Sequence, residues 1–338
     1  MTIQSPGAPP AAPAVALHDI FLAARRIAPH IRSTPLERSA ALSEELGCAV
    51  WLKLECQQRT GSFKLRGALN RLLALPVEAR ARGVLTCSAG NHGLGMAEAA
   101  RLTGIPATIV VPENASPAKI AGLRRTGVAL LIVGADYDAA EALAPQIAEE
   151  RGLAFVSPYD DPLVIAGAGT VALEIMRDLP EVGTILVPVG GGGLASGVGI
   201  AAKGINPRVR VLGAQSEASP ALSAALAAGR LVPVANGATL ADGLAGNIAA
   251  GSITFPLVRD HLDEVATVPE AAIGAAMLTF LDRHHLVVEG AGAVGLAWLQ
   301  HQPPRGLPEP IVLIVSGGNV ATGVLATLLG DARDGEIR

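Results

Sequence analysis

Short apolar runs alternate with longer amphipathic segments along most of this 338-residue chain. Runs with the composition of strands occupy 50–54, 83–87, 107–111, 128–133, 154–157, 184–189, 209–214 and 311–315. Segments with the length and spacing of helices occupy 17–28, 39–46, 65–75, 91–102, 116–125, 137–151, 166–179 and 195–202. This alternation predicts βαβ units and an α/β fold whose mostly parallel sheets are covered by helices on both faces. Residues 237–253 lack a clear period and are expected to form a long loop.

Two uncharged runs, 182–202 and 310–330, are long enough to cross a bilayer if each forms a single helix. The first contains four successive glycines and Pro188, and the second contains Ser316-Gly317-Gly318-Asn319. Each run divides better into a short strand, a glycine turn and a helix. We therefore expect buried parallel strands here and no membrane span.

Composition narrows the possible functions further. Half of the residues are apolar, 17% are charged and the net charge is −4, which is typical of a compact α/β enzyme and gives no basic footprint for nucleic acid. The length suggests two domains. The three cysteines form no CxxC pair, which favours reduced thiols and a cytoplasmic location.

Lys64 is the first candidate for catalysis. It lies between Gly61 and Gly67, after the apolar run 50–54 and at the start of the helix expected at 65–75. The field at a helix N-terminus opposes a positive charge, and partial burial lowers the pKa of an ammonium. A neutral amine is the form that condenses with a carbonyl group. An ordinary solvated lysine on a first helical turn fits these residues as well.

The loop Ser88-Ala89-Gly90-Asn91-His92-Gly93 lies between an expected strand and an expected helix. Its backbone N–H groups suit an anion such as a substrate carboxylate, and Asn91 can donate or accept a hydrogen bond. A helix cap followed by a packing glycine is the alternative.

A second loop, Gly190-Gly191-Gly192-Gly193-Leu194, follows another apolar strand. Four glycines allow the backbone to wrap closely around a phosphate, but no Lys-Ser/Thr follows, so this is not a Walker loop. A dinucleotide site remains open, although the glycine fingerprint fits loosely and no acidic residue lies about 20 residues further on. Ser316, in the third loop, stands at a strand's carboxyl end and is either a ligand donor or a helix cap.

Together these stretches resemble the serine/threonine dehydratases, which are pyridoxal-phosphate enzymes of the tryptophan-synthase-β fold (fold type II). The resemblance covers roughly residues 17 to 330, and several ordered motifs make a chance match improbable. In the family's order the similar stretches are Thr34-Pro35-Leu36, Lys53-Leu54-Glu55, 62–68, 88–92, Gly169-Thr170, 190–194, Ala241-Asp242-Gly243, 288–293 and 316–319. The resemblance implies two three-layer α/β domains.

The resemblance also implies a pyridoxal 5'-phosphate cofactor and assigns residues to it. Lys64 is similar to the lysine that holds the cofactor as a Schiff base, and Asn91 matches the asparagine beside its phenolic oxygen. Ser316 matches the residue hydrogen-bonded to the pyridine nitrogen. The other implied residues are Phe63, Gly190, Gly191, Gly192, Gly193 and Leu194 around the cofactor, and Ser88, Ala89, Gly90, Asn91 and His92 around the substrate. No metal ligand is implied.

The implied reaction converts L-threonine to 2-oxobutanoate and ammonia, or L-serine to pyruvate and ammonia. The amine of Lys64 is expected to remove the α-proton while the cofactor ring spreads the resulting charge. Because no motif offers another acid, the cofactor's phosphate is expected to protonate the departing hydroxyl.

Serine racemases of the same family are the main alternative. They carry a serine where this chain has Ala89, and their divalent-metal carboxylates correspond to Gln215 and Ala221 here. Tyr159 stands where racemases tend to carry a small polar residue. These departures favour elimination. A dehydratase of a modified β-hydroxy amino acid, a nicotinamide-dependent dehydrogenase and a non-catalytic cofactor-binding protein also remain open.

We expect residues 1–16 to be a flexible tail, 17–67 plus 161–338 a large cofactor-binding domain, and 68–160 a small mobile domain. No C-terminal regulatory domain is expected, which favours a degradative or unregulated enzyme. The expected partners are an amino-acid substrate and a second copy of the chain in a homodimer.

Overall fold

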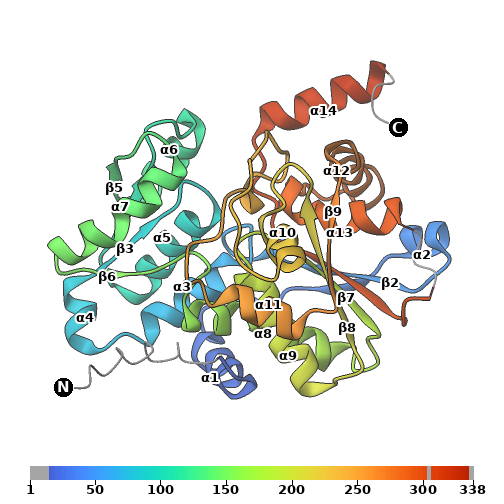
Figure 1. Cartoon of the computed structure of the whole chain (residues 1–338), viewed down its shortest axis with the longest axis horizontal. Coiled ribbons are helices and arrows are strands. Elements are labelled where there is room, and N and C mark those ends of the chain that lie inside the picture. The colour runs from blue at the N-terminus through green and yellow to red at the C-terminus, as the bar shows by residue number, and fades with distance from the viewer. Residues whose placement is uncertain (1–14, 303–305, 335–338) are drawn as a thin grey trace, which may run out of the picture.

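The computed structural model describes residues 15–302 and 306–334, and in this part of the chain the strands form two separate sheets (Figure 1). The strands are β1 Leu36–Arg38, β2 Val50–Leu54, β3 Val84–Cys87, β4 Ala107–Val111, β5 Ala129–Ile132, β6 Ala154–Phe155, β7 Thr184–Pro188, β8 Arg210–Ser216, β9 Glu264–Val268 and β10 Ile311–Val315. The helices are α1 Leu17–Ile27, α2 Ala40–Leu46, η1 Glu55–Gln57, α3 Lys64–Leu73, α4 Val77–Arg82, α5 Asn91–Thr103, α6 Pro117–Arg124, α7 Tyr137–Glu150, α8 Pro162–Asp178, α9 Gly193–Ile205, α10 Ala221–Ala228, η2 Asp242–Leu244, α11 Thr254–His261, α12 Glu270–His284, α13 Gly290–His301 and α14 Thr322–Asp334.

The strand order is β1-β2-β10-β7-β8-β9 in one sheet and β5-β4-β3-β6 in the other. Every pairing is parallel except β1 with β2. The predicted α/β fold with mostly parallel sheets is therefore confirmed. The uncharged runs at 182–202 and 310–330 are strand–turn–helix units, β7–α9 and β10–α14. No helix in the described residues is long and apolar enough to span a membrane.

Helices cover both faces of the six-stranded sheet. Along β7, Ile185 and Val187 join the apolar cluster formed with α1, α8 and α9, whereas Leu186 joins the cluster formed with α12 and α13. This alternation follows from the two-residue repeat of a strand. Both clusters are buried, which explains why strands of the parallel sheet are apolar throughout.

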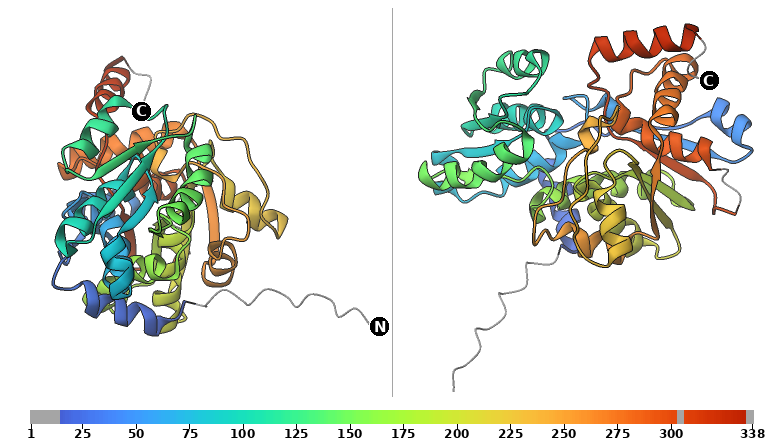
Figure 2. Two further views of the ribbon diagram at one scale, coloured as in Figure 1. Left: turned by 90° about the vertical axis from the view of Figure 1, so that its left-hand side faces the viewer. Right: turned by 45° about the horizontal axis from the view of Figure 1, so that its top comes forward.

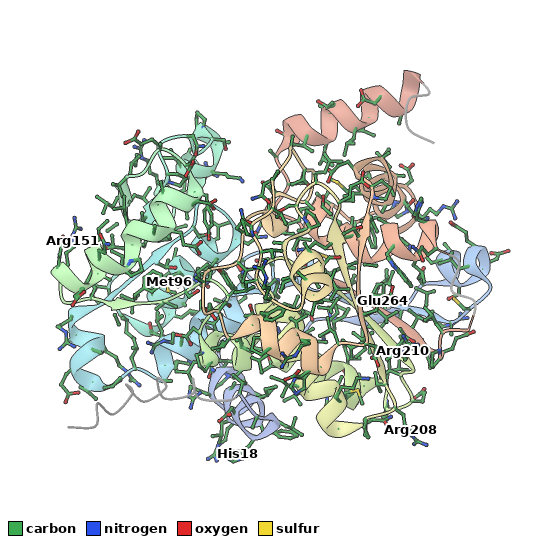
Figure 3. All side chains as sticks on the ribbon, viewed as in Figure 1. His18, Met96, Arg151, Arg208, Arg210 and Glu264 are labelled. Carbon is green, nitrogen blue, oxygen red and sulfur yellow. The ribbon has the colours of Figure 1, made fainter. Side chains whose placement is uncertain are left out.

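The two sheets lie in different parts of the molecule, and α14 runs along its outer edge in both turned views of Figure 2. Charged side chains such as Arg151 and Arg208 lie at the rim, whereas Met96 on α5 is fully buried inside the fold (Figure 3). Met96 packs with Leu65 and Leu69 of α3 in one apolar cluster. This packing holds α3 and α5, which carry Lys64 and Asn91, against each other.

The helix expected at 166–179 begins earlier, because α8 starts at Pro162. The carboxylate of Asp161 accepts hydrogen bonds from the backbone N–H groups of Leu163 and Val164 at 2.7 and 3.1 Å. An acidic cap followed by proline is a strong start signal that outweighs the apolar spacing further on. Asp160 was expected to be a solvated turn residue, but its Oδ1 accepts hydrogen bonds from Ser252 Oγ and the backbone N–H of Ile253, both at 2.9 Å.

The expected loop at 237–253 contains no strand and no α-helix, only the short η2 turn. The sequence pattern did not resolve α4, α10, α11 and β9. These elements are short, so few residues carry their periodicity.

A buried ion network connects β2, α3 and α8. The guanidinium of Arg66 donates to both carboxylate oxygens of Glu55 at 2.8 Å and to those of Glu174 at 2.7 and 2.9 Å. Lys53 Nζ donates to Glu174 Oε2 at 2.5 Å and to the carbonyl oxygen of Thr34 at 2.7 Å. Arg66, Lys53 and Glu55 are fully buried. Burial alone raises the pKa of Glu174, but Arg66 and Lys53 hold it below its usual value.

We expect Arg66→Met to lower the free energy of unfolding by about 3–5 kcal/mol, because it leaves Glu55 and Glu174 facing a single buried cation. Urea unfolding followed by circular dichroism measures this loss. Arg177→Met is the matched control, since Arg177 is exposed and its carboxylate partner is the adjacent Asp178, and it should leave the unfolding midpoint unchanged. Equal midpoints for Arg66→Met and the wild type would contradict the stabilising role of the network.

Candidate active site

The lysine segment and the Ser316 loop are paired through their backbones. The Phe63 N–H donates to the Ser316 carbonyl oxygen at 3.1 Å, and the Gly318 N–H donates to the Gly61 carbonyl oxygen at 2.9 Å. Ser62 and Gly317 form an isolated antiparallel bridge between them. The two segments follow β2 and β10, which are parallel neighbours, so their carboxyl ends meet at one edge of the sheet.

Lys64 is the first residue of α3, and its Nζ donates to the carbonyl oxygen of Pro158 at 2.8 Å. Burial lowers the pKa of its ammonium to about 8, although the charges of Glu141 and Glu289 oppose this shift. An amine with this pKa is partly neutral near pH 8, where an ordinary lysine stays charged. The structure thus supports the sequence-based hypothesis that Lys64 is available as a nucleophile and base.

The other lysines differ from Lys64 in their partners. The sequence contains four lysines, and all lie in the part of the chain that the structure describes. Lys53 pairs with Glu174, Lys119 with Asp242 and Lys203 with Asp263, at 2.5–2.7 Å. Within the described residues Lys64 alone has no carboxylate partner. Its amine is therefore not held by a salt bridge.

Asn91 joins the other two loops. It begins α5 directly after the loop 88–90, and its Nδ2 donates to Glu289 Oε1 at 2.6 Å. The side chain of Asn319 donates to Asn91 Oδ1 at 2.7 Å and to the carbonyl oxygen of Thr60 at 2.8 Å. The predicted loops therefore lie together, with Asn91 linking one sheet to the other.

His92 lies just inside this cluster. Only 2% of its surface is exposed, and neither ring nitrogen has a hydrogen-bond partner among the described residues. Burial lowers its pKa well below the usual value, and the charge of Lys64 acts in the same direction. The imidazole is therefore neutral and offers hydrogen-bonding capacity without a positive charge.

The glycine loop connects β7 to α9. Gly192 is the N-cap of α9 and has a φ of 87°, a left-handed conformation that favours glycine. None of the backbone N–H groups from Gly190 to Leu194 donates to an acceptor within residues 15–302 and 306–334. Unpaired N–H groups at a helix N-terminus form an anion site, and this loop is the part of the site that suits a phosphate.

Tyr159 covers the glycine loop. A methyl group added at Gly191 would lie 2.5 Å from Cγ of the Tyr159 ring, and one added at Gly193 would lie 2.8 Å from the Tyr159 carbonyl oxygen. Side chains at these two positions would therefore collide with Tyr159. Because Lys64 binds the carbonyl oxygen of the preceding Pro158, the Pro158-Tyr159 segment places the lysine beside the glycine loop.

Glu289 is absent from the site residues predicted from the sequence, although it stands in the similar stretch 288–293. It precedes α13 as its N-cap and is 5% exposed. Burial raises its pKa to about 7, while the hydrogen bond from Asn91 opposes this shift. A methyl group added at Gly317 would lie 2.0 Å from Glu289 Oε1, so only glycine fits there. Ser316, by contrast, is buried and its hydroxyl donates to the Ala291 carbonyl oxygen at 3.3 Å.

An exposed ion pair links α6 to the η2 turn beside the site. Lys119 Nζ lies 2.6 Å from Asp242 Oδ2, and the two side chains are 45% and 55% exposed. Gly243 approaches Ala291 closely, with 3.4 Å between an added methyl group and Cβ. The charges of Asp242 and Lys119 also act in opposite directions on the pKa of Glu289. The pair therefore lies near the buried carboxyl group and joins the four-stranded part of the molecule to the six-stranded part.

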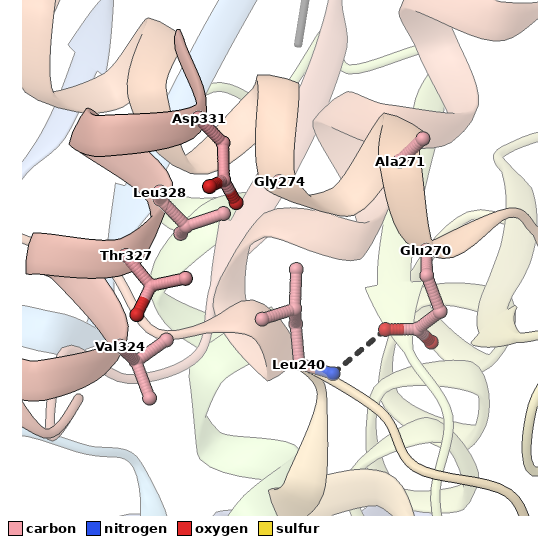
Figure 4. A pocket seen from close by; sticks show the side chains of 8 residues that line it. All are labelled: Leu240, Glu270, Ala271, Gly274, Val324, Thr327, Leu328 and Asp331. Atoms are coloured by element: carbon pink, nitrogen blue, oxygen red, sulfur yellow. Dashed lines mark hydrogen bonds between the residues drawn. The ribbon is translucent and has the colours of Figure 1, made fainter. Parts of the chain in front are cut away.

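A cavity of about 350 Å³ lies elsewhere, between α12, α14 and the chain before η2 (Figure 4). Its lining residues are Leu240, Glu270, Ala271, Gly274, Val324, Thr327, Leu328 and Asp331. The Leu240 N–H donates to Glu270 Oε2 at 2.7 Å. None of the site residues predicted from the sequence lines this cavity, so it is separate from the candidate active site.

The chain matches the family of pyridoxal-phosphate dependent enzymes over residues 27–317. The L-threonine ammonia-lyase of Geobacter sulfurreducens is 44% identical over 304 residues, which are 90% of this chain and 75% of that protein. Maize serine racemase has a TM-score of 0.88 at 36% identity, covering 96% of this chain and 100% of that structure. A threonine deaminase from T.th. has a TM-score of 0.84 at 40% identity, with 90% and 99% covered.

We expect Glu289→Gln to stabilise the ligand-free protein increasingly as the pH rises. The pKa of Glu289 is raised from 4.5 to about 7 in the folded state, so ionisation adds no cost below 4.5 and its full cost above about 7. The gain should be on the order of 2–3 kcal/mol at pH 8 and absent at pH 4.5. Melting temperatures across this range measure it, with the exposed Glu217 as the control position for the same change. A gain that is independent of pH would contradict the assignment.

Proposed function

This chain belongs to the pyridoxal-phosphate dependent enzymes, and from that premise we propose that it dehydrates and deaminates β-hydroxy amino acids. The proposed reactions convert L-threonine to 2-oxobutanoate and ammonia, and L-serine to pyruvate and ammonia. The 44% identity to an L-threonine ammonia-lyase and the 40% identity to a threonine deaminase support threonine as a substrate. Ala89 supports elimination, because a methyl side chain has no proton to exchange with the substrate.

One observation carries the assignment of Lys64 as the lysine that holds the cofactor. Within the described residues it is the lysine without a carboxylate partner, and it lies beside the glycine loop through the Pro158-Tyr159 segment. The other lysines are engaged in ion pairs, and Lys53 is also fully buried. A lysine with a lowered pKa next to an anion site has the chemistry that a phosphate-bearing aldehyde requires.

The residues present fit pyridoxal phosphate. The unpaired N–H groups of Gly190 to Leu194 would hold its phosphate at the start of α9. Asn91 would bind the phenolic oxygen and Ser316 the pyridine nitrogen, with Phe63 beside the ring. When bound, the cofactor supplies a ring that stabilises negative charge on the substrate's α-carbon.

The protein's own groups would bind the substrate and move its protons. The loop Ser88-Ala89-Gly90-Asn91-His92 offers backbone N–H groups at the start of α5 to the substrate carboxylate. Neutral His92 adds hydrogen-bonding capacity there. The Lys64 amine, with its pKa near 8, would accept the α-proton at Nζ. Glu289 holds Asn91 in place through the 2.6 Å hydrogen bond.

We further propose that residues 68–160 form a small mobile domain, with 17–67 and 161–338 forming the large one. The location of the four-stranded sheet within 84–155 supports this division. Closure of the small domain would exclude water from the reacting atoms, and the Lys119–Asp242 pair would hold the closed form. A homodimer in the cytoplasm completes the proposal, and the three free cysteines agree with a reducing compartment.

The first test uses the purified protein saturated with pyridoxal phosphate. We expect a yellow protein that releases oxo acid from L-threonine or L-serine, and a borohydride-reduced label on the peptide that contains Lys64. Lys64→Ala should lower turnover by at least about 10²-fold, because it removes the proton acceptor. Lys203→Ala, a lysine in a surface ion pair, is the matched control and should keep full activity.

Other outcomes separate the competing functions. Interconversion of the serine enantiomers without oxo-acid release would assign a racemase. A label on Lys53, Lys119 or Lys203 would overturn the assignment of Lys64. A panel of β-hydroxy amino acids, measured by oxo-acid release, would identify the preferred side chain.

A second test concerns the Lys119–Asp242 pair. We expect Lys119→Met and Asp242→Asn each to raise KM about two- to fivefold, which is the effect of losing one exposed ion pair. The effect should shrink at high salt because salt screens exposed charges. The exchange Lys119→Asp with Asp242→Lys should restore part of the loss, whereas Lys203→Met should leave KM unchanged. Equal KM values in all variants would argue against a closing contact.

A further inference from the structure

Glu141 is a largely buried carboxyl group for which the proposed reaction has so far provided no role. It lies on α7, one helical turn after Tyr137, whose hydroxyl donates to its Oε1 at 3.0 Å. No lysine, arginine or histidine in the described part of the chain forms an ion pair with it. Burial raises its pKa, and the Tyr137 bond opposes this shift. The group therefore favours the form that carries a proton.

The topology places Glu141 at the same edge of the sheet as the substrate loop. Helix α7 begins shortly after β5 ends, so its first turns lie at the carboxyl edge of the four-stranded sheet. Ala140 and Ala144 of α7 pack in one apolar cluster with Leu85 and Cys87 of β3. Cys87 directly precedes Ser88, the first residue of the loop assigned to the substrate carboxylate. Glu141 therefore comes from the element that packs beside this loop.

The charge of Glu141 also reaches the reacting lysine. After burial, it is the largest influence on the pKa of Lys64, ahead of Glu289. It likewise raises the pKa of Tyr159, whose ring covers the glycine loop. The titratable groups that face Glu141 are Tyr137 and Asp138 on its own helix, Cys87 at the end of β3, Lys64 on α3, and Tyr159 and Asp160 before α8.

We propose that Glu141 is the acid that protonates the departing β-hydroxyl group of the substrate, a role that rests on the function proposed above. The Lys64 amine takes the α-proton, and the electron pair of that C–H bond forms the new Cα–Cβ double bond. The Glu141 carboxyl gives its proton to the β-oxygen as the Cβ–O bond breaks, and the oxygen leaves with its electron pair as water. The Lys64 ammonium then returns a proton to the Glu141 carboxylate.

This arrangement makes the electrostatics of the two groups favour the reaction. Before elimination the pair is a neutral amine and a neutral acid, and afterwards it is an ammonium and a carboxylate. Attraction between opposite charges in a largely buried site stabilises the second state. The acid assigned from sequence was the cofactor's phosphate, because no motif identified another. Glu141 is separated from Lys64 by 77 positions, so only the folded chain brings its charge to bear on the lysine.

The decisive experiment compares two leaving groups in the holoenzyme of Glu141→Gln. L-Serine loses a hydroxyl that requires a proton, whereas 3-chloro-L-alanine loses chloride, which requires none. We expect kcat for serine to fall by at least about 10²-fold, the usual contribution of a general acid. The initial rate of pyruvate release from 3-chloro-L-alanine should stay within about threefold of the wild type, since the shared α-proton step is intact. Asp138→Asn removes a neighbouring exposed carboxylate and should change neither rate.

A second variant tests the same role through pH. Tyr137→Phe removes the hydrogen bond that lowers the pKa of Glu141, so the acid should keep its proton to higher pH. The alkaline limb of kcat for serine should therefore move upward, while the profile for 3-chloro-L-alanine should not move. Cofactor absorbance and far-UV circular dichroism check that each variant is folded and loaded.

The outcomes are distinct. If Glu141→Gln loses both substrates equally, or keeps both, Glu141 is not the leaving-group acid. If the wild type releases pyruvate from 3-chloro-L-alanine and from no hydroxy amino acid, the leaving-group role and the dehydratase function both fail. If it releases oxo acid from serine and Glu141→Gln shows no difference between leaving groups, only the role of Glu141 fails.

Discussion

The buried contact between Arg66 and its two carboxylate partners is the interaction on which the site depends. Arg66 lies two residues after Lys64 on α3, and Glu55 and Glu174 hold its guanidinium from β2's end and from α8. Charges without partners are costly to bury, so these three elements are fixed relative to one another. The helix that begins with the reactive lysine is therefore anchored from below by ions and hydrogen bonds.

The same network explains several stretches that carried the family resemblance without an evident role. Thr34 donates its hydroxyl to Glu55 Oε1 at 2.5 Å, and Lys53 binds the carbonyl oxygen of Thr34. Thr170 on α8 accepts a hydrogen bond from Arg66 at 3.2 Å. These residues do not belong to the loops that face the proposed cofactor. Their chemistry is structural, because each satisfies a buried polar group that would otherwise be unpaired.

Above the network, burial tunes the groups that handle protons. It lowers the pKa of Lys64 to about 8 and raises that of Glu289 to about 7. Desolvation disfavours the charged form in both cases and so brings a base and an acid toward neutrality. The same cause keeps His92 neutral. The bonds from Asn91 to Glu289 and to Asn319 connect these groups across the two sheets.

The local sequence was enough to predict the alternating strands and helices, the parallel sheets and the three glycine-containing turns, because periodicity and turn chemistry act over a few residues. The motif resemblance was confirmed by the match to the pyridoxal-phosphate dependent enzymes over residues 27–317. Only the tertiary structure brought Lys64 beside Pro158, joined Asn91 to Glu289, and set Lys119 against Asp242. These partners are 94 to 198 positions apart. Burial and Coulomb interactions at such separations depend on how the two sheets pack, and no local pattern contains that information.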